Sequence, residues 1–229
     1  MTLAIMQPYF FPYIGYWQLI NAVDVFVIFD DVNYIKKGYI NRNNILINGV
    51  SQKIILELKG VSQNKLINEI EIGNNTQNLL KTIEVSYKKA PFFSVVFSIL
   101  EDILKQEEKN LAKFIGYSLK KISDYLGIDT KFIYSSEVEK NTSFKGQDKI
   151  LDICKVFETV NYINAIGGKK LYSKIEFKKQ NICLSFLDTS LLEYKQFGRE
   201  FIPYLSIIDI IMFNHKDNVS KMLMQYKLI

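Results

Sequence analysis

Short apolar runs that alternate with helical patterns are the feature that most constrains the fold of this chain. Residues 3–6 read as a strand, residues 15–22 as a helix and residues 24–30 as a second strand. The run "DVFVIFD" is almost continuously β-branched or aromatic and is bounded by acids, which is typical of a strand buried on both faces. The same alternation returns later in the chain, with strands at 131–136, 161–166 and 181–188 and helices at 147–158 and 169–179. This pattern predicts an α/β fold of the Rossmann-like kind, a mainly parallel sheet flanked by helices.

Two further features are expected beside that sheet. Asn48-Gly49 is a strong two-residue turn signal between "NILI" and "SQKIILEL", so it predicts a β-hairpin, and residues 68–72 read as a short strand. The middle of the chain, about 76–127, is helical and reads as an insertion or a cap on the sheet. Two helices, about 204–213 and 217–227, would finish the chain. No internal repeat or low-complexity linker interrupts these elements, so we expect one domain over residues 1–229.

Composition excludes several classes of protein and of site. A chain of 229 residues can bury a large core without a disulfide or a metal. Cys154 and Cys183 are its only cysteines and His215 its only histidine, so we expect reduced thiols, no metal centre and no Ser-His-Asp triad. No signal peptide and no apolar run of membrane-spanning length are recognised, so a cytoplasmic protein without a transmembrane segment is expected.

The charge pattern bears on the partners. The net charge of +5 is spread over dispersed lysine pairs, most of which are typical of solvated faces. A preference for anionic substrates or membrane surfaces is also compatible with it. Without a dense basic block or a recognisable nucleic-acid-binding fold, DNA is not an expected partner.

The first candidate site is the opening segment "QPYFFPYIGYW", because ligands of open α/β sheets bind at the carboxyl ends of strands and near helix N-termini. It would form the turn between the first strand and the first helix. Gly15 allows a close backbone approach, Gln7 offers a polar contact, and Pro8, Tyr13 and Tyr16 belong to the wall of the turn. The alternative is a plain turn whose aromatic rings only pack.

The second candidate follows the buried strand. Asp30 and Asp31 precede "VNYIKKGYINRNN", which places Lys37, Arg42 and two asparagines, Asn41 and Asn43, in one irregular segment. This exceeds what a solvated loop requires, and binding residues concentrate on such loops. We therefore favour a functional role for this segment over a solvated loop.

Two more places carry open alternatives. Gly167-Gly168-Lys169-Lys170 lies between a strand and a helix and reads either as a phosphate-binding turn or as a plain helix start. Near the C-terminus, Ser206 and Asp209 share one face of an otherwise apolar helix. A buried carboxylate must be paired or hydrogen-bonded, so Asp209 is either an anchor for the opening segment or a functional group.

Several of the residues singled out above match the sequence pattern of a known protein family. The segment "QPYFFPYIGYWQLINAVDVFVIFDDVNYIKKGYINRNNI" closely resembles the signature of the WbqC-like family, and "YKKAPFF", "GGKKLY" and "EYKQFGREFIPYLSIIDIIMFN" extend the match over nearly the whole chain. One departure is His215-Lys216, where the family pattern has a glycine. The matching pattern positions are Gln7, Pro8, Gly15, Asp30, Asp31, Asn41, Arg42, Asn43, Gly168, Tyr172, Gln196, Ser206 and Asp209.

The resemblance implies a role in the biosynthesis of surface polysaccharide, including the O-antigen of lipopolysaccharide. For a protein of this kind we expect an aminoacyl transferase, with glycine as a suspected group, acting on the amine of a nucleotide-linked amino sugar. Asp30 or Asp31 would be the general base, and Lys37 and Arg42 would hold phosphates. Asn41 and Asn43 would polarise the acyl carbonyl. The donor stays open between an adenylate, a thioester and an aminoacyl-tRNA, and no cofactor is assigned.

A second resemblance concerns Tyr13-Ile14-Gly15-Tyr16, which occupies the place of the His-x-Gly-His motif in nucleotidylyltransferases and class I synthetases. Both histidine positions hold tyrosines here, which cannot carry the positive charge that holds ATP phosphates there. The competing hypothesis is a non-catalytic protein that binds a nucleotide sugar in the same pathway. A homo-oligomer is compatible with either hypothesis.

Overall fold

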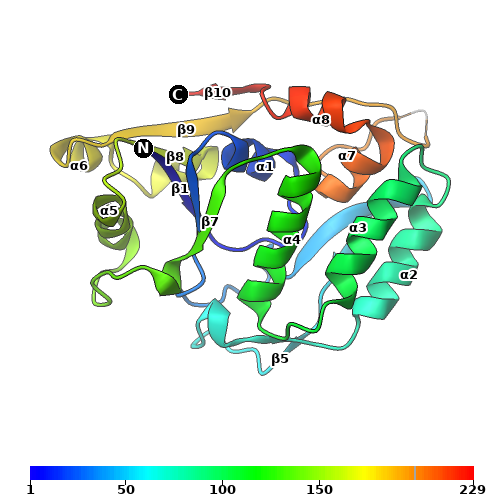
Figure 1. The fold of residues 1–229 in the computed structure, drawn as a ribbon, viewed down its shortest axis with the longest axis horizontal. Coiled ribbons are helices and arrows are strands. Elements are labelled where there is room, and N and C mark those ends of the chain that lie inside the picture. The colour runs from blue at the N-terminus through cyan, green and yellow to red at the C-terminus, as the bar shows by residue number, and fades with distance from the viewer. Residues whose placement is uncertain (199) are drawn as a thin grey trace.

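A six-stranded sheet forms the centre of the protein (Figure 1). The computed structural model describes residues 1–198 and 200–229. The strand order is β10-β9-β8-β1-β2-β7. The parallel strands are β1 (Thr2–Met6), β2 (Val25–Ile28), β7 (Lys131–Tyr134), β8 (Asn161–Ala165) and β9 (Cys183–Thr189), and β10 (Tyr226–Leu228) runs antiparallel to β9. The predicted α/β fold with a mainly parallel sheet is confirmed.

The order of the strands determines where a ligand is expected. From β1 the chain adds β2 and β7 on one side and then crosses to add β8 and β9 on the other. This is the order of a doubly wound sheet, whose strand order reverses between β1 and β8. In such sheets ligands bind outside the carboxyl ends of the strands near this reversal.

Helices cover both faces of the sheet. Along β1, Ala4 faces one core while Leu3 and Ile5 face another, as the two-residue period of a strand requires. Figure 1 shows α1 (Ile14–Asn21) and α4 (Leu111–Leu126) on one side and α5 (Gly146–Val156) and α6 (Lys174–Lys179) on the other. Both faces of the central strands are therefore buried, which explains the near-continuous apolar run of β2.

The predicted hairpin and helical insertion are also present. Strand β3 (Arg42–Ile47) pairs with β4 (Val50–Ile55) through a turn in which Asn48 and Gly49 have φ of 51° and 78°. The insertion consists of α2 (Thr76–Tyr87), α3 (Phe93–Lys105) and α4. Two C-terminal helices, α7 (Ile207–Phe213) and α8 (Lys216–Met222), pack against α3 and α4. The short strands β5 (Leu58–Lys59) and β6 (Glu71–Ile72) form a two-stranded sheet.

Three element predictions were wrong in detail. The helix expected at 217–227 ends at Met222, because Tyr226–Leu228 instead pairs with the open edge of β9 as β10. The helix expected at 169–179 is a 3-10 turn, Ile166–Lys170, followed by α6. The strand expected at 68–72 is reduced to β6, preceded by a 3-10 turn over Ile67–Glu69. For Tyr226–Leu228, tertiary pairing with β9 overrides the local helical pattern. No helix within the described residues has the length and apolarity that crossing a membrane requires.

Candidate functional site

The opening segment between β1 and α1 is held in place by the hairpin and the C-terminal helices. Its backbone turns at Phe11, where φ is 43°. The side-chain amide of Asn43 donates to the carbonyl oxygens of Phe10 and Phe11. Ser206 caps α7 and donates its hydroxyl to the Phe11 carbonyl at 2.8 Å. Trp17 Nε1 donates to the Pro12 carbonyl at 3.0 Å. The segment is therefore a fixed wall whose polar backbone groups are largely satisfied by the protein.

Other predicted residues of this region also serve the fold. Asn41 accepts a hydrogen bond from the Tyr34 hydroxyl at 2.9 Å and donates to the Leu56 carbonyl at 2.8 Å. Tyr16 is buried and donates to the backbone carbonyl of Gln7 at 2.8 Å. The Pro8 ring is buried, whereas the Gln7 side chain is half-buried. The side chains of Asn41 and Asn43 therefore hydrogen-bond within the protein.

Gly15 does provide a close approach, but to the protein's own side chains. A Cβ at this position would lie 2.5 Å from Thr189 Oγ1 and closer still to the Tyr13 hydroxyl. Burial raises the pKa of Tyr13, while a hydrogen bond with Thr189 lowers it. Glycine at this position therefore lets the start of α1 pack against the end of β9.

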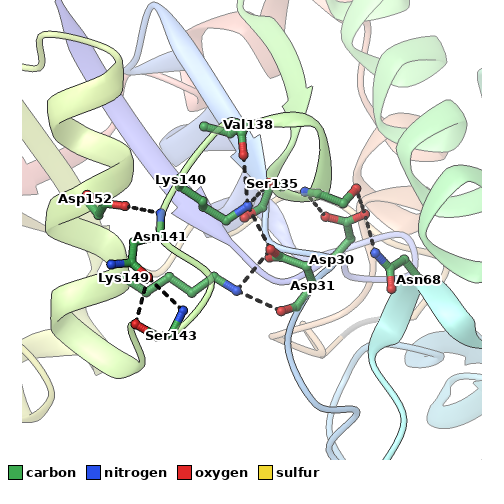
Figure 2. Close-up of polar contacts among 11 residues, drawn as sticks. Asp30, Asp31, Asn68, Ser135, Val138, Lys140, Asn141, Ser143, Lys149 and Asp152 are labelled. Atoms are coloured by element: carbon green, nitrogen blue, oxygen red, sulfur yellow. Dashed lines mark hydrogen bonds and ion pairs between the residues drawn. The ribbon is translucent and has the colours of Figure 1, made fainter.

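Asp30, at the end of β2, is a buried carboxylate held by neutral donors (Figure 2). The backbone amide of Ser136 donates to its Oδ1 at 2.9 Å, and the Ser136 hydroxyl donates to its Oδ2 at 2.6 Å. Asn68 donates to Oδ2 at 3.3 Å. Asp30 therefore joins the end of β2 to the segment after β7.

Asp31 is paired with two lysines that the sequence patterns did not single out. Its Oδ2 lies 2.8 Å from Lys140 Nζ and 3.0 Å from Lys149 Nζ, and the two lysine side chains are only 3% and 10% exposed. Lys149 also donates to the Asp31 backbone carbonyl at 2.8 Å. Burial alone would raise the pKa of Asp31, but hydrogen bonds from Lys140, Ser135 and Lys149 outweigh burial and lower that pKa. Asp31 is therefore ionised at neutral pH.

The loop that carries Lys140 is fastened to α5. Figure 2 shows Asn141 beside Asp152, and the Asn141 backbone amide donates to the Asp152 carboxylate at 2.7 Å. The Ser143 amide and hydroxyl both donate to the Asn141 side-chain oxygen. The position of Lys140 is therefore fixed relative to the start of α5.

A cavity of about 760 Å³ lies at the carboxyl ends of β2 and β7, and we call it the basic cleft. Its lining includes Phe29, Asp31, Lys140, Phe144, Lys145, Gly146 and Lys149. Gly146 is the first residue of α5, where backbone amides lack helical partners and the helix dipole is positive. Three lysines, one aspartate and a helix N-terminus give the cleft a net positive character that suits a phosphate.

A sequence signal for this cleft existed but was missed. "KGQDK" places Lys145 and Gly146 directly before a predicted helix, the same pattern that singled out Gly167-Gly168-Lys169-Lys170. The burial of Lys140 could not be foreseen, because its partners lie more than a hundred positions away or in the loop itself.

The remaining predicted residues lie apart from the basic cleft. Arg42, at the start of β3, is half-buried beside Tyr34; burial raises the pKa of that tyrosine, and the nearby guanidinium opposes the rise. Lys37 is exposed on a loop. After β8, Gly168 packs against Asn164, Lys169 is exposed, and Tyr172 contacts Tyr162 edge-on. Neither Lys37 nor Arg42 lines the cleft as the structure describes it.

Asp209 lies at the centre of a buried hydrogen-bond network. Its carboxylate accepts hydrogen bonds of 2.7 Å each from Tyr87, Tyr194 and Gln196. Gln196 also exchanges two hydrogen bonds with the backbone of Ile202. Burial raises the pKa of Asp209, although the three donors oppose that rise. The network ties the segment before α7 to α2.

Comparison with known proteins gives a family but no reaction. The model of the WbqC-like protein family matches residues 7–221. A protein of Mycobacterium tuberculosis, named "Uncharacterized protein Rv1507c", is 27% identical over 213 residues, which are 91% of each chain. No solved structure matches the chain. The expected family is thereby confirmed: the chain belongs to the WbqC-like protein family.

Proposed function

We propose that this protein transfers an aminoacyl group, glycyl or similar, to the amine of a nucleotide-linked amino sugar in the biosynthesis of surface polysaccharide such as O-antigen. The observation that supports it is the basic cleft at the carboxyl ends of β2 and β7. It lies on the carboxyl-end edge of the sheet, the edge at which open α/β sheets bind ligands, on the β2 side of the reversal between β1 and β8. The free thiols of Cys154 and Cys183 suit a reducing compartment, so we assign the reaction to the cytoplasm.

The cleft offers the parts that a nucleotide sugar requires. Lys145 is exposed at the start of α5, and together with Lys149 and the first amides of that helix it can hold a diphosphate. Phe29 and Phe144 line the same cavity and offer faces for a base or a sugar ring. The cleft therefore supplies both anion binding and an apolar surface.

The chemical step would be amide formation. The neutral sugar amine attacks the acyl carbon and a C–N bond forms. The C–O bond of an adenylate or aminoacyl-tRNA, or the C–S bond of a thioester, breaks so that AMP, tRNA or the thiol leaves, and the amine loses a proton. Of the two predicted bases, Asp31 lines the cleft, whereas both oxygens of Asp30 accept hydrogen bonds from the protein. Asp31 is ionised and can accept that proton or orient the amine.

A specific observation favours the second candidate, a non-catalytic nucleotide-sugar-binding protein. A carboxylate whose pKa is lowered by two lysines is a weak base, and Asp31 is such a carboxylate. The binding role needs the cleft but no base.

Binding and transfer are tested separately. Titration calorimetry with UDP- and dTDP-linked amino sugars should show binding that Lys145→Gln weakens by about tenfold, the loss expected for one charge-assisted hydrogen bond. Lys155→Gln is the matched control, because Lys155 is exposed at the far end of the same helix. Mass spectrometry after addition of glycyl donors and of donors of larger amino acids should then detect the amide.

The outcomes distinguish the two candidates. Binding followed by product supports the transferase. Binding without product from adenylate, thioester or tRNA donors supports the binding protein. If wild type and Lys145→Gln bind the nucleotide sugars with equal affinity, the basic cleft is not their binding site in either candidate function.

A further inference from the structure

A second cavity, of about 220 Å³, lies at the carboxyl ends of β8 and β9, and we call it the tyrosine cavity. It shares no lining residue with the basic cleft in the described part of the chain. Both cavities lie at the same edge of the sheet, because both are at the carboxyl ends of parallel strands. Strands β8 and β1 lie between β9 and β2. Three strand spacings place them roughly 15 Å apart, which leaves room for two substrates along this edge.

The walls of the tyrosine cavity are largely apolar. Leu191 and Phe201 from the segment after β9 face Ile14 at the start of α1 and Ile210 of α7. A cavity of about 150 Å³ with such walls is large enough to hold benzene. The tyrosine cavity therefore has space for an apolar group of at least that size.

Its polar groups select for positive charge. Asp188, at the end of β9, is exposed, and it is the charged residue among the described lining residues. Tyr13, Tyr194 and Tyr204 contribute aromatic rings to the same lining. A carboxylate beside aromatic rings attracts an ammonium group and repels an anion. This electrostatic character is the opposite of that of the basic cleft.

One wall of the cavity is fixed in advance. The hydroxyl of Tyr194 donates to Asp209 at 2.7 Å, so its ring cannot turn away without breaking this hydrogen bond. Gln196 holds the following segment by its hydrogen bonds to Ile202. Asp209 is thus a positioning residue for this wall. A preformed pocket loses less entropy when a ligand binds.

We propose that the tyrosine cavity binds a small organic ammonium ion that carries an apolar body. Resting on the proposed function, this ligand is the amino-acid moiety of the donor, with its α-ammonium group at Asp188 and its side chain among Ile14, Leu191 and Phe201. The size of the cavity then favours an aliphatic or aromatic aminoacyl group over glycyl, since glycine would leave the apolar walls without a partner.

Ligand-observed NMR with amino-acid amides tests this inference, because amides carry the ammonium group without a competing carboxylate. Leucinamide should bind, glycinamide should bind at least tenfold more weakly, and 4-methylpentanamide, which lacks only the amine, should also bind at least tenfold more weakly. Asp188→Asn should weaken leucinamide about tenfold. Glu84→Gln, an exposed acid of α2 outside the cavity, is the matched control.

A second variant keeps the test independent of folding defects. Leu191→Ala truncates an exposed lining residue and should weaken leucinamide while leaving glycinamide unchanged. Equal binding of leucinamide and 4-methylpentanamide, or an unchanged affinity in both variants, would overturn the inference. Nucleotide sugars are titrated separately, so loss of their binding would contradict the proposed function while leaving this result intact.

Discussion

The side-chain amide of Asn43 in β3 lies 3.2 Å from the carbonyl oxygen of Phe10 in the opening segment and donates a hydrogen bond to it. The same amide reaches the carbonyl of Phe11, and the Asn43 side-chain oxygen accepts from the backbone amide of Asn44. Every polar atom of this buried side chain is thus engaged within the protein. Asn43 therefore shapes the wall of the site instead of offering donors to a ligand.

Asn43→Ala should consequently destabilise the fold. The Phe11 carbonyl keeps the Ser206 hydroxyl as a donor, but the buried Phe10 carbonyl loses its side-chain donor, at about 1–3 kcal/mol. Urea denaturation of Asn43→Ala and of Asn44→Ala provides the comparison, because the Asn44 side chain is half-buried and makes no hydrogen bond among the described residues. Equal stability of the two variants would contradict the role assigned to Asn43.

Gly15→Ala should destabilise the protein through a local clash. The added methyl group would lie 2.5 Å from Thr189 Oγ1 and also against the Tyr13 hydroxyl, and overpacking of this kind costs about 1–3 kcal/mol. The loss should be smaller in a Tyr13→Ala background, because both Tyr13 atoms that the methyl group would meet, the hydroxyl oxygen and the ring carbon that carries it, are absent there. Gly167→Ala is the control, because no heavy atom lies within 4 Å of its added Cβ. Thermal unfolding of wild type, Gly15→Ala, Tyr13→Ala, the double variant and Gly167→Ala measures the difference, and a Gly15→Ala variant as stable as Gly167→Ala would refute the packing argument.

Much of the fold follows from local patterns. The continuous apolar run of β2 reports burial on both faces, and Asn48-Gly49 fixes the hairpin by its positive φ angles. The structure of the C-terminal end was harder to predict from the sequence, because whether Tyr226–Leu228 forms a helix or a strand depends on the free edge of β9. Such a pairing is decided by tertiary structure and not by neighbouring residues.

The candidate site was only partly predictable. The pattern singled out Asp31, but its partners Lys140 and Lys149 lie more than a hundred positions away, and their burial depends on the crossover from β7 to β8. Asn41 and Asn43 looked like free donors, because a sequence does not show which backbone carbonyls a side chain will meet. Local chemistry therefore indicated the region, while long-range contacts decided the role of each group.

Asp31→Asn should destabilise the protein by about 3 kcal/mol, because it leaves Lys140 and Lys149 buried without their carboxylate. The folded-state pKa of Asp31 is lowered, so its ion pairs contribute stability above its ordinary pKa of 3.8, and this contribution is lost as the pH falls through the lowered value. Unfolding free energies from urea titrations at pH 7 and at successively lower pH test this. The difference in unfolding free energy between wild type and Asp31→Asn should decrease as the pH falls.

The control for Asp31 is Asp102→Asn. Asp102 also pairs with a lysine, Lys121, but both side chains are largely exposed, so the pair is screened by water. Its loss should change stability far less than the loss of Asp31. Comparable costs for the two variants would show that burial of the lysines contributes nothing to the Asp31 pair.

Asp209 should give a pH dependence of the opposite sign. Burial raises its folded-state pKa above the ordinary 3.8, so the folded protein holds a proton that the unfolded chain has already released. Stability from this group is therefore greatest below 3.8 and declines as the pH rises through the raised pKa. The neighbouring hydroxyls of Tyr87 and Tyr194 do not titrate in this range, because burial raises their pKa values above the ordinary value for tyrosine.

The variant Asp209→Asn tests this, because its side chain cannot ionise. Subtracting the unfolding free energies of the variant from those of wild type isolates the contribution of Asp209. The difference should fall as the pH increases from about 3.8, whereas parallel curves would mean that the buried network holds Asp209 with no change in its proton affinity.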